Sequence, residues 1–110
     1  MNRWTDWQPF PDPRKKDYIH APFGPGVYEL RRVGTKRLVL RGQGGNCAYR
    51  MTSLLPTPLG QGTRKNSSKR NYVLANLDQI EYRSCPCETK ADAKKLEAHL
   101  NKDDPCIFPT

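Results

Sequence analysis

The chain has 110 residues, of which 35% are hydrophobic. This length predicts one domain with a modest core, and the low hydrophobic content argues against a large ligand cavity inside it. Its formal net charge of +8 indicates a polyanionic partner, most of all nucleic acid. A basic protein that has no nucleic-acid role is the alternative. No apolar run approaches the roughly 18–20 residues that span a bilayer, and the N-terminus lacks the apolar core of a signal peptide. We therefore expect no membrane association and a cytoplasmic location.

Residues 1–25 predict an extended arm that precedes the folded domain. The segment holds five of the ten prolines together with Trp4, Trp7 and Phe10. Because proline lacks a backbone donor and fixes φ, the arm is predicted to be neither a helix nor a central strand. Its aromatic side chains are predicted to pack on the surface of the domain at residues 26–110, with base stacking or protein binding as alternatives.

Two strands joined by a tight turn are predicted next. Residues 26–33 have the two-residue side-chain period of a strand, and Tyr28 lies near its middle. Gly34-Thr35 is a plausible two-residue hairpin turn with glycine in the first position. Residues 36–42 supply the returning strand, so the pattern predicts an antiparallel hairpin.

A helix and a polar segment follow the hairpin. Asn46 is a good N-cap, and the helix that it begins is predicted to end before Pro56. Residues 60–68 are polar and glycine-rich, and residues 72–77 predict a short helix or turn.

The C-terminal part of the domain predicts a third strand and a longer helix. Residues 79–85 form the strand, and Thr89 with Asp92 resembles a capping box for a helix that extends to about Lys102. The order β-β-α-(α)-β-α predicts an α+β fold, in which a small, mainly antiparallel three-stranded sheet is flanked by helices over residues 26–110.

An arginine near the start of the first helix suits phosphate binding. Arg50 lies one helical turn after Asn46, where the glycine-rich entry directs backbone N–H groups towards an anion. A guanidinium there binds a phosphate in bidentate fashion and offsets negative charge in a phosphoryl transition state. A solvated surface arginine is the alternative.

Glu97 is the candidate metal ligand among the carboxylates. It follows Ala93 by four residues and precedes Leu100 by three, so it lies on or beside the apolar stripe of its helix. A carboxylate that faces inward costs free energy unless it is paired or binds a metal ion. A boundary glutamate that reaches solvent is the alternative.

These motifs together resemble the GIY-YIG nuclease family over about residues 24–105. The resemblance implies a divalent-metal-dependent endonuclease that hydrolyses phosphodiester bonds in DNA. It assigns assistance in deprotonating the attacking water to Tyr28, the phosphate clamp to Arg50, and Mg²⁺ or Mn²⁺ binding to Glu97. The residues that carry it are Gly26-Val27-Tyr28, Gly42, Asn46, Arg50 and Glu97.

The sequence departs from the family pattern at the second tyrosine, which falls on Leu40. Tyr49 and Tyr72 are the candidate substitutes, and Tyr49 is included among the predicted catalytic residues. The family's asparagine after the metal-binding helix also has no counterpart beyond Pro105. A catalytically degenerate nucleic-acid-binding module on the same fold is therefore the first alternative, and a protein-interaction domain that uses the aromatic arm is the second.

A cluster of cations predicts the surface that contacts nucleic acid. Four basic residues occur within seven positions without an acidic one, and Arg41 is expected to add to the same surface. Such contacts position DNA without reading its sequence, and RNA is an alternative partner. Specificity would then be low, or would come from a homodimer or a partner protein. The four cations are Arg64, Lys65, Lys69 and Arg70.

The four cysteines form a poor zinc motif. Cys85 and Cys87 are spaced by two positions rather than by the three of a common zinc pair. Cys47 is predicted to be a core residue, and His99 is predicted to lie on the surface. Structural zinc bound by these cysteines and Cys106 remains the weaker hypothesis.

Overall fold

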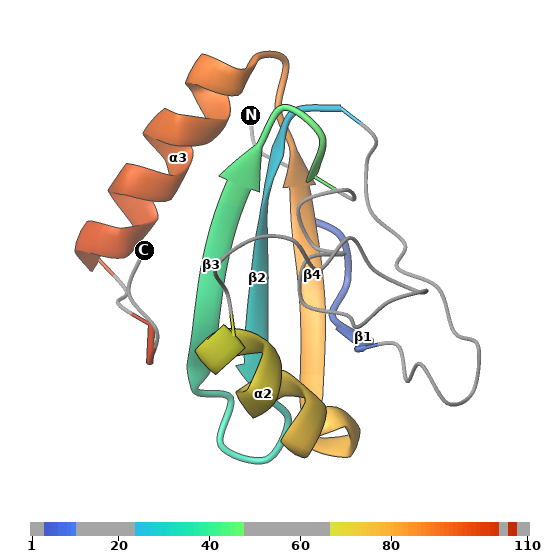
Figure 1. Ribbon diagram of the computed structural model, residues 1–110. Helices are drawn as coiled ribbons and strands as arrows, with labels where there is room; N and C mark the ends of the chain where they lie inside the picture. Colours follow the sequence, from blue (N-terminus) through green and yellow to red (C-terminus); the bar gives the residue numbers. More distant parts are fainter. Residues whose placement is uncertain (1–3, 11–23, 48–66, 104–105, 108–110) are drawn as a thin grey trace.

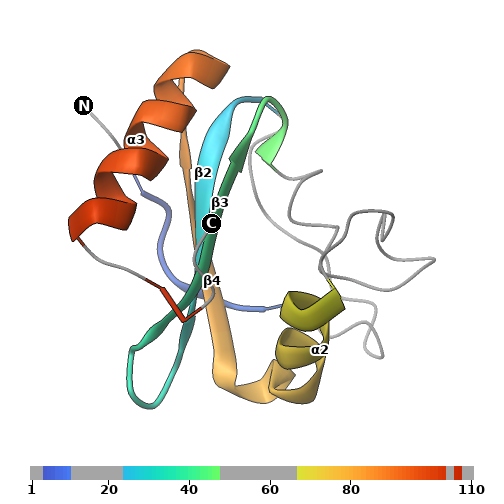
Figure 2. The same cartoon turned by 60° about the vertical axis from the view of Figure 1, so that its left-hand side comes forward.

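The computed structural model describes residues 4–10, 24–47, 67–103 and 106–107. In these ranges an antiparallel sheet lies between two helices, which cover opposite faces (Figures 1 and 2). The α+β architecture predicted from the sequence is confirmed, whereas the predicted strand count is wrong because the sheet has four strands. The elements are β1 (Gln8–Pro9), β2 (Gly26–Arg32), β3 (Leu38–Gly44), α2 (Ser67–Ala75), the 3₁₀ helix η2 (Leu77–Gln79), β4 (Ile80–Pro86) and α3 (Lys90–Asp103).

The strand order in the sheet is β1-β4-β2-β3, and every neighbouring pair is antiparallel. The central strand β2 therefore carries Tyr28 between two partners, Gly42 on β3 and Ser84 on β4. The three longer strands agree closely with those predicted from side-chain alternation. Among the described residues, no helix has both the length and the apolar character that a membrane span requires.

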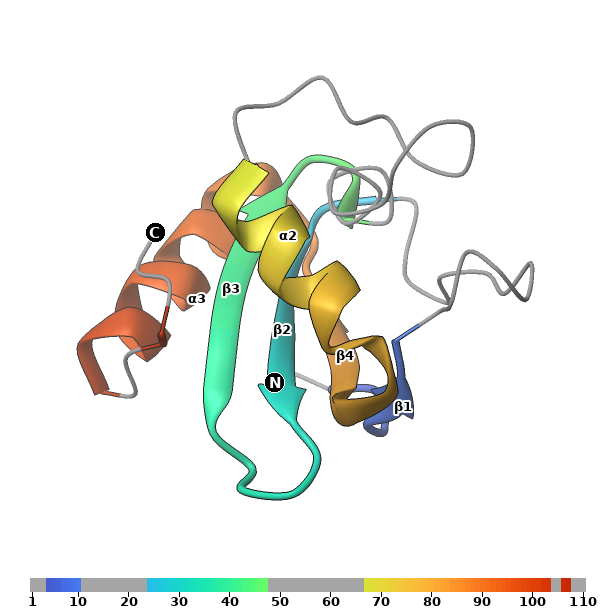
Figure 3. The same cartoon turned by 60° about the horizontal axis from the view of Figure 1, so that its bottom comes forward.

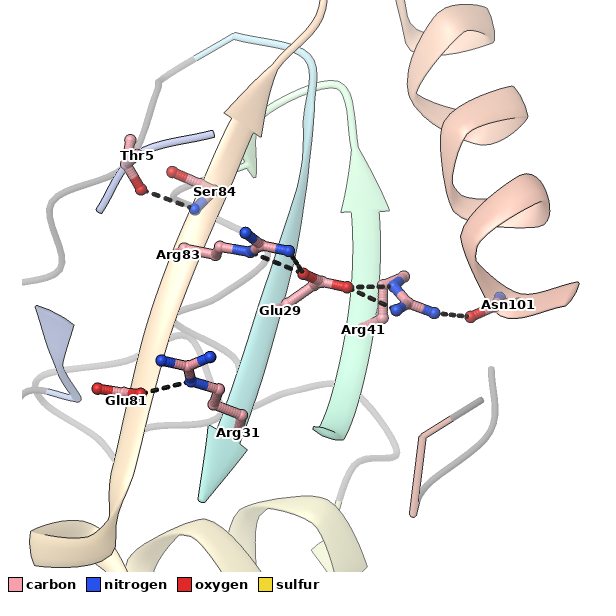
Figure 4. Close-up of polar contacts among 8 residues, drawn as sticks. All are labelled: Thr5, Glu29, Arg31, Arg41, Glu81, Arg83, Ser84 and Asn101. Atoms are coloured by element: carbon pink, nitrogen blue, oxygen red, sulfur yellow. Dashed lines mark hydrogen bonds and ion pairs between the residues drawn. The ribbon is translucent and has the colours of Figure 1, made fainter. Parts of the chain in front are cut away.

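The additional strand comes from the N-terminal arm. The backbone N–H of Thr5 donates to the carbonyl oxygen of Ser84 at 2.8 Å, and the N–H of Phe10 donates to the carbonyl oxygen of Ile80 at 3.0 Å. Figure 4 shows Thr5 beside β4, where its hydroxyl oxygen also accepts the N–H of Ser84. Pro9 is tolerated because β1 is an edge strand, where a missing backbone donor breaks no ladder.

The hairpin between β2 and β3 differs from the predicted two-residue turn. Lys36, not Gly34, has a positive φ, of 59°. The N–H of Lys36 donates to the carbonyl oxygen of Arg32 at 2.8 Å, and the N–H of Arg32 donates to that of Arg37 at 2.9 Å. The connection is therefore longer than predicted, and it closes at Lys36, whose backbone is in the left-handed conformation.

The apolar core lies between the sheet and α2. Leu30 and Leu40 face each other across β2 and β3, and both are almost fully buried with Val73 of α2. Phe10 meets the ring of Tyr82 edge to face, at 5.8 Å between centroids. Figure 3 shows α2 lying across the strands on the face away from α3.

The start of α3 agrees with the prediction, whereas α2 begins earlier than predicted. The hydroxyl oxygen of Thr89 accepts the N–H of Asp92 at 3.1 Å, so the predicted cap of α3 is confirmed. The predicted short helix or turn at residues 72–77 belongs to α2 and η2, and α2 begins earlier, at Ser67.

Candidate functional site

Tyr28 and Gly42 form the most constrained contact of the candidate site. They are directly opposed on β2 and β3, and the phenol ring of Tyr28 lies over the glycine. A Cβ built on Gly42 would lie less than 3.0 Å from three atoms of the Tyr28 side chain, the hydroxyl oxygen Oη and the ring carbons Cζ and Cε1. Tyr28 is only 7% exposed, so the absence of a side chain at position 42 determines where its hydroxyl group can lie.

Leu40, at which the resemblance to the nuclease family would place a second tyrosine, is part of the apolar core. Leu40 is 1% exposed and opposes Leu30. Tyr72, one candidate substitute, accepts a hydrogen bond from Nη1 of Arg32 at 2.9 Å. The hydroxyl of Tyr72 is therefore bound to an arginine near the far end of β2, four residues from Tyr28.

Glu97 lies on the side of α3 that faces the sheet, as predicted. It is partly buried and lies between Ala93, which is fully buried, and Asn101, one turn later. The side-chain oxygen of Asn101 accepts a hydrogen bond from Nη1 of Arg41 on β3 at 2.8 Å. This contact fixes the face of the sheet against which α3 packs.

Tyr28 and Glu97 approach the sheet from opposite faces. Side chains alternate along a strand, so Tyr28 and Glu29 point to opposite faces, and α3 lies on the face of Glu29 and Arg41. Figure 2 shows α3 and α2 on the two sides of the sheet. A site that uses both side chains would therefore be located around the outer edge and the C-terminal end of β3.

The loop after β3 brings that end of the sheet next to α3. A Cβ built on Gly45 would lie 3.9 Å from Cδ of Lys90, the first residue of α3. The N–H of Cys47 donates to the carbonyl oxygen of Gly24 at 2.9 Å, which fixes Cys47 beside the start of β2. The predicted helix entry is therefore adjacent to both β2 and α3.

Several predicted site residues fall outside the described residues. Their roles remain predictions from the sequence. Two other members of the predicted cationic cluster, Lys69 and Arg70, are described and belong to α2. The residues outside the description are Tyr49, Arg50, Arg64 and Lys65.

Arg41 does not belong to a surface that contacts nucleic acid, so this prediction is wrong. Its side chain is 0% exposed and forms an ion pair with Glu29, whose side chain is 1% exposed. Nε and Nη2 of Arg41 donate to Oε2 of Glu29 at 2.8 and 2.5 Å (Figure 4). A buried guanidinium must be neutralised inside the protein, and Glu29 does this for Arg41.

A second arginine completes the environment of Glu29. Nε of Arg83 donates to Oε1 of Glu29 at 2.9 Å, and its Nη2 lies 2.7 Å from the same oxygen. Each carboxylate oxygen thus contacts one guanidinium group. Glu29 and Arg41 are directly opposed in the hairpin register, and opposite charges at opposed strand positions are the signal by which sequence reasoning could have found this pair.

The tryptophans of the arm stack on arginines of the sheet. Cζ of Arg83 lies 4.2 Å from the ring centroid of Trp4 and 4.7 Å from that of Trp7. Cζ of Arg31 lies 3.9 Å from the Trp7 centroid, and Arg31 is also paired with Glu81. The prediction that the aromatic residues of the arm pack on the domain is confirmed for these two.

The thiols are poorly suited to chemistry. Burial, followed by the charges of the neighbouring Cys87 and Cys85, raises the pKa of Cys47 to about 12. Burial and then the charge of Asp92 also raise the pKa of Cys87. Since the thiolate is the reactive form, neither thiol is activated.

A pocket of about 440 Å³ lies between the end of β4 and α3, and Glu97 is not among its lining residues. Its lining includes the carboxylate of Asp92, the amine of Lys95, the imidazole of His99 and the thiol of Cys87. His99 is exposed and lies 3.3 Å from Asp103, in agreement with its predicted surface position.

A metal ion bound at Glu97 would have few protein ligands. Over the ranges that the structure describes, no group of three or more His, Cys, Asp or Glu side chains is arranged to hold a metal ion. Mg²⁺ tolerates such a site, because it is commonly held by one or two carboxylates, waters and substrate oxygens. A single partly buried carboxylate therefore fits Mg²⁺ or Mn²⁺ better than zinc.

Comparison of the chain with models of protein families, with curated proteins and with solved structures finds no match.

Proposed function

We propose that the protein is a divalent-metal-dependent endonuclease that hydrolyses phosphodiester bonds in DNA, in the manner of the GIY-YIG nucleases. The observation that carries this proposal is the contact between Tyr28 and Gly42. These residues correspond to the tyrosine and the glycine of the two family motifs, and their packing gives a physical reason for the pairing. An aromatic ring packed over a glycine across a sheet also serves structure alone, so the support comes from the coincidence of both residues with the two motif positions.

The proposed roles follow from the chemistry of the side chains. Oη of Tyr28, held in place by its packing on Gly42, would orient the attacking water and assist removal of its proton. The carboxylate of Glu97 would hold Mg²⁺ or Mn²⁺. Such an ion, when bound, polarises a phosphate oxygen and stabilises charge on the leaving oxygen. Arg50 would bind the phosphate through its guanidinium group.

Binding of the DNA backbone is proposed to depend on the cationic cluster Arg64, Lys65, Lys69 and Arg70. The net charge of +8 supports a polyanionic partner. Contacts of this kind neutralise phosphates and make affinity depend on salt without selecting a sequence.

A binding-only module on the same fold is the second candidate function. Leu40 supports it, because an apolar, buried side chain occupies the place of the second tyrosine and has no lone pair to accept a proton. The contact between Tyr72 and Arg32 supports it further, because the hydroxyl of one possible substitute already accepts a hydrogen bond from an arginine.

The decisive experiment is single-turnover nicking of supercoiled DNA with Mg²⁺ and with EDTA. The wild-type protein should nick DNA with Mg²⁺ alone, and Glu97→Gln should abolish nicking while DNA affinity stays the same. Asp103→Asn is the matched control, because it changes a carboxylate to an amide at a 61% exposed position of the same helix. Tight DNA binding without nicking by the wild type would favour the binding-only module.

A further inference from the structure

A continuous set of contacts crosses one face of the sheet from the N-terminal segment to α3, and Figure 4 shows the part from Arg83 to Asn101. At one end, Trp4 stacks on Arg83 at 4.2 Å. At the other end, Asn101 of α3 accepts a hydrogen bond from Arg41 at 2.8 Å. The carboxylate of Glu29 joins the two arginines. We refer to Arg83, Glu29, Arg41 and Asn101 as the relay.

Glu29 links the positions of the two arginines. Its side chain is 1% exposed, and it uses Oε1 for Arg83 and Oε2 for Arg41. In a buried network each charged group is stabilised by the others, and the loss of one partner leaves the rest incompletely compensated. A displacement of Arg83 is therefore expected to shift the balance of contacts that holds Arg41 and, through it, Asn101.

The tryptophan stack is better suited to fastening the arm than to binding bases. Trp7 already has two guanidinium groups near its ring, Arg31 at 3.9 Å and Arg83 at 4.7 Å. Arg31 is also paired with Glu81, and Arg83 shares the carboxylate of Glu29 with Arg41. Bases stack on accessible aromatic faces, and two arginine side chains of the protein already lie near the ring of Trp7.

We infer that residues 4–10 are a positioning element for α3, and that the relay transmits their effect to Glu97. Asn101 lies one helical turn after Glu97 on the side that faces the sheet, so a change at Asn101 alters the turn that carries the carboxylate. This inference rests on the proposed function, in which Glu97 binds the metal ion. Arg83 is in this view a positioning residue.

A matched pair of substitutions separates this role from general stabilisation. Arg83→Gln and Arg31→Gln each remove a guanidinium stacked on Trp7 and each break an ion pair with a glutamate. Only Arg83 is connected to α3 through Glu29. Amide hydrogen exchange of residues 94–103 should be faster in Arg83→Gln by roughly 2- to 30-fold, the range of coupling between linked sites, and nearly unchanged in Arg31→Gln.

Mn²⁺ affinity, measured by electron paramagnetic resonance, tests the effect on Glu97 without relying on cleavage. Arg83→Gln should weaken Mn²⁺ binding by a factor in the same rough range of 2 to 30, whereas Arg31→Gln should bind Mn²⁺ like the wild type. In the double variant Arg83→Gln/Asn101→Ala the two effects should not add, because both residues belong to the relay.

Three results would overturn the inference: equal exchange rates of α3 in the two variants, unchanged Mn²⁺ affinity in Arg83→Gln, or no Mn²⁺ binding by the wild type. A different result rejects the proposed function alone. If the wild type binds Mn²⁺ through Glu97 and Arg83→Gln weakens that binding, but no DNA is nicked, the relay stands and the nuclease activity does not.

Discussion

The phenol ring of Tyr28 on β2 occupies the space that a side chain at Gly42 on β3 would need. This packing restricts the rotamers of a tyrosine that is only 7% exposed. Gly42 therefore determines where the Tyr28 hydroxyl group can lie, although it contributes no chemical group itself.

Gly42→Ala tests that relationship. The added methyl group should displace the Tyr28 ring, destabilise the fold by about 1–3 kcal/mol, as overpacking does, and reduce nicking about as much as Tyr28→Phe. Gly34→Ala is the control, because a Cβ at that position meets no atom within 4 Å. Urea denaturation and single-turnover nicking provide the measurements, and wild-type nicking by Gly42→Ala would contradict the proposed role of the contact.

Leu40→Tyr restores the residue of the family pattern but places a larger side chain in a filled core. Leu40 is 1% exposed and packs opposite Leu30. We expect a loss of about 1–3 kcal/mol in the free energy of unfolding and no gain in nicking. Val33→Tyr, at a 47% exposed position, should cost little. A tenfold rise in nicking by Leu40→Tyr would instead identify the natural protein as a degenerate member that binds DNA.

Replacement of Arg64, Lys65, Lys69 and Arg70 by serine should weaken binding to all DNA sequences about equally. The slope of log K against log salt should become shallower by roughly 0.9 for each duplex phosphate contact that is lost. Serine at Lys36 and Arg37, which are exposed at the hairpin tip, is the control for a general change in charge. An unchanged slope in the four-residue variant would indicate that the cluster is only solvated.

Cys47 should make stability fall at high pH. Its folded-state pKa of about 12 exceeds its ordinary value of 9.0, so above pH 9 the unfolded chain releases a proton that the folded chain retains. The contribution is complete below pH 9 and is lost as pH rises towards 12, at about 1.4 kcal/mol per pH unit. Urea denaturation of the wild type should show this extra slope, and Cys47→Ala should lack it. Iodoacetamide at pH 8 should modify Cys47 only in the unfolded protein.

Much of the fold could be predicted from the sequence, because the decisive signals are local. Side-chain alternation located the three longer strands, and Thr89 located the start of α3. The fourth strand was not predictable in this way, because Gln8–Pro9 forms it only by pairing with a distant partner and proline argues against a strand. The hairpin turn was misjudged because glycine was expected to take the left-handed position that Lys36 occupies.

The candidate site was predictable in part. Helical spacing placed Glu97 on the side that faces the sheet, and its partial burial agrees with this. Arg41 was misplaced, because a local cluster of basic residues does not reveal which of them has a buried partner across the sheet. The opposite-face positions of Tyr28 and Glu97 were also not predictable, because they depend on which face α3 covers.

The short strand β1 has a consequence for how the molecule behaves among its own copies. The open edge of a sheet is a template on which other chains can add strands and aggregate, and proline is one of the residues that block such addition. Here β1, with Pro9, covers the edge of β4, and the N–H of Ile107 binds the carbonyl oxygen of Leu38 on β3 at 3.1 Å. Proteolytic loss of the first ten residues would uncover the edge of β4 between Ile80 and Ser84, and a protein trimmed in this way should become prone to intermolecular sheet formation.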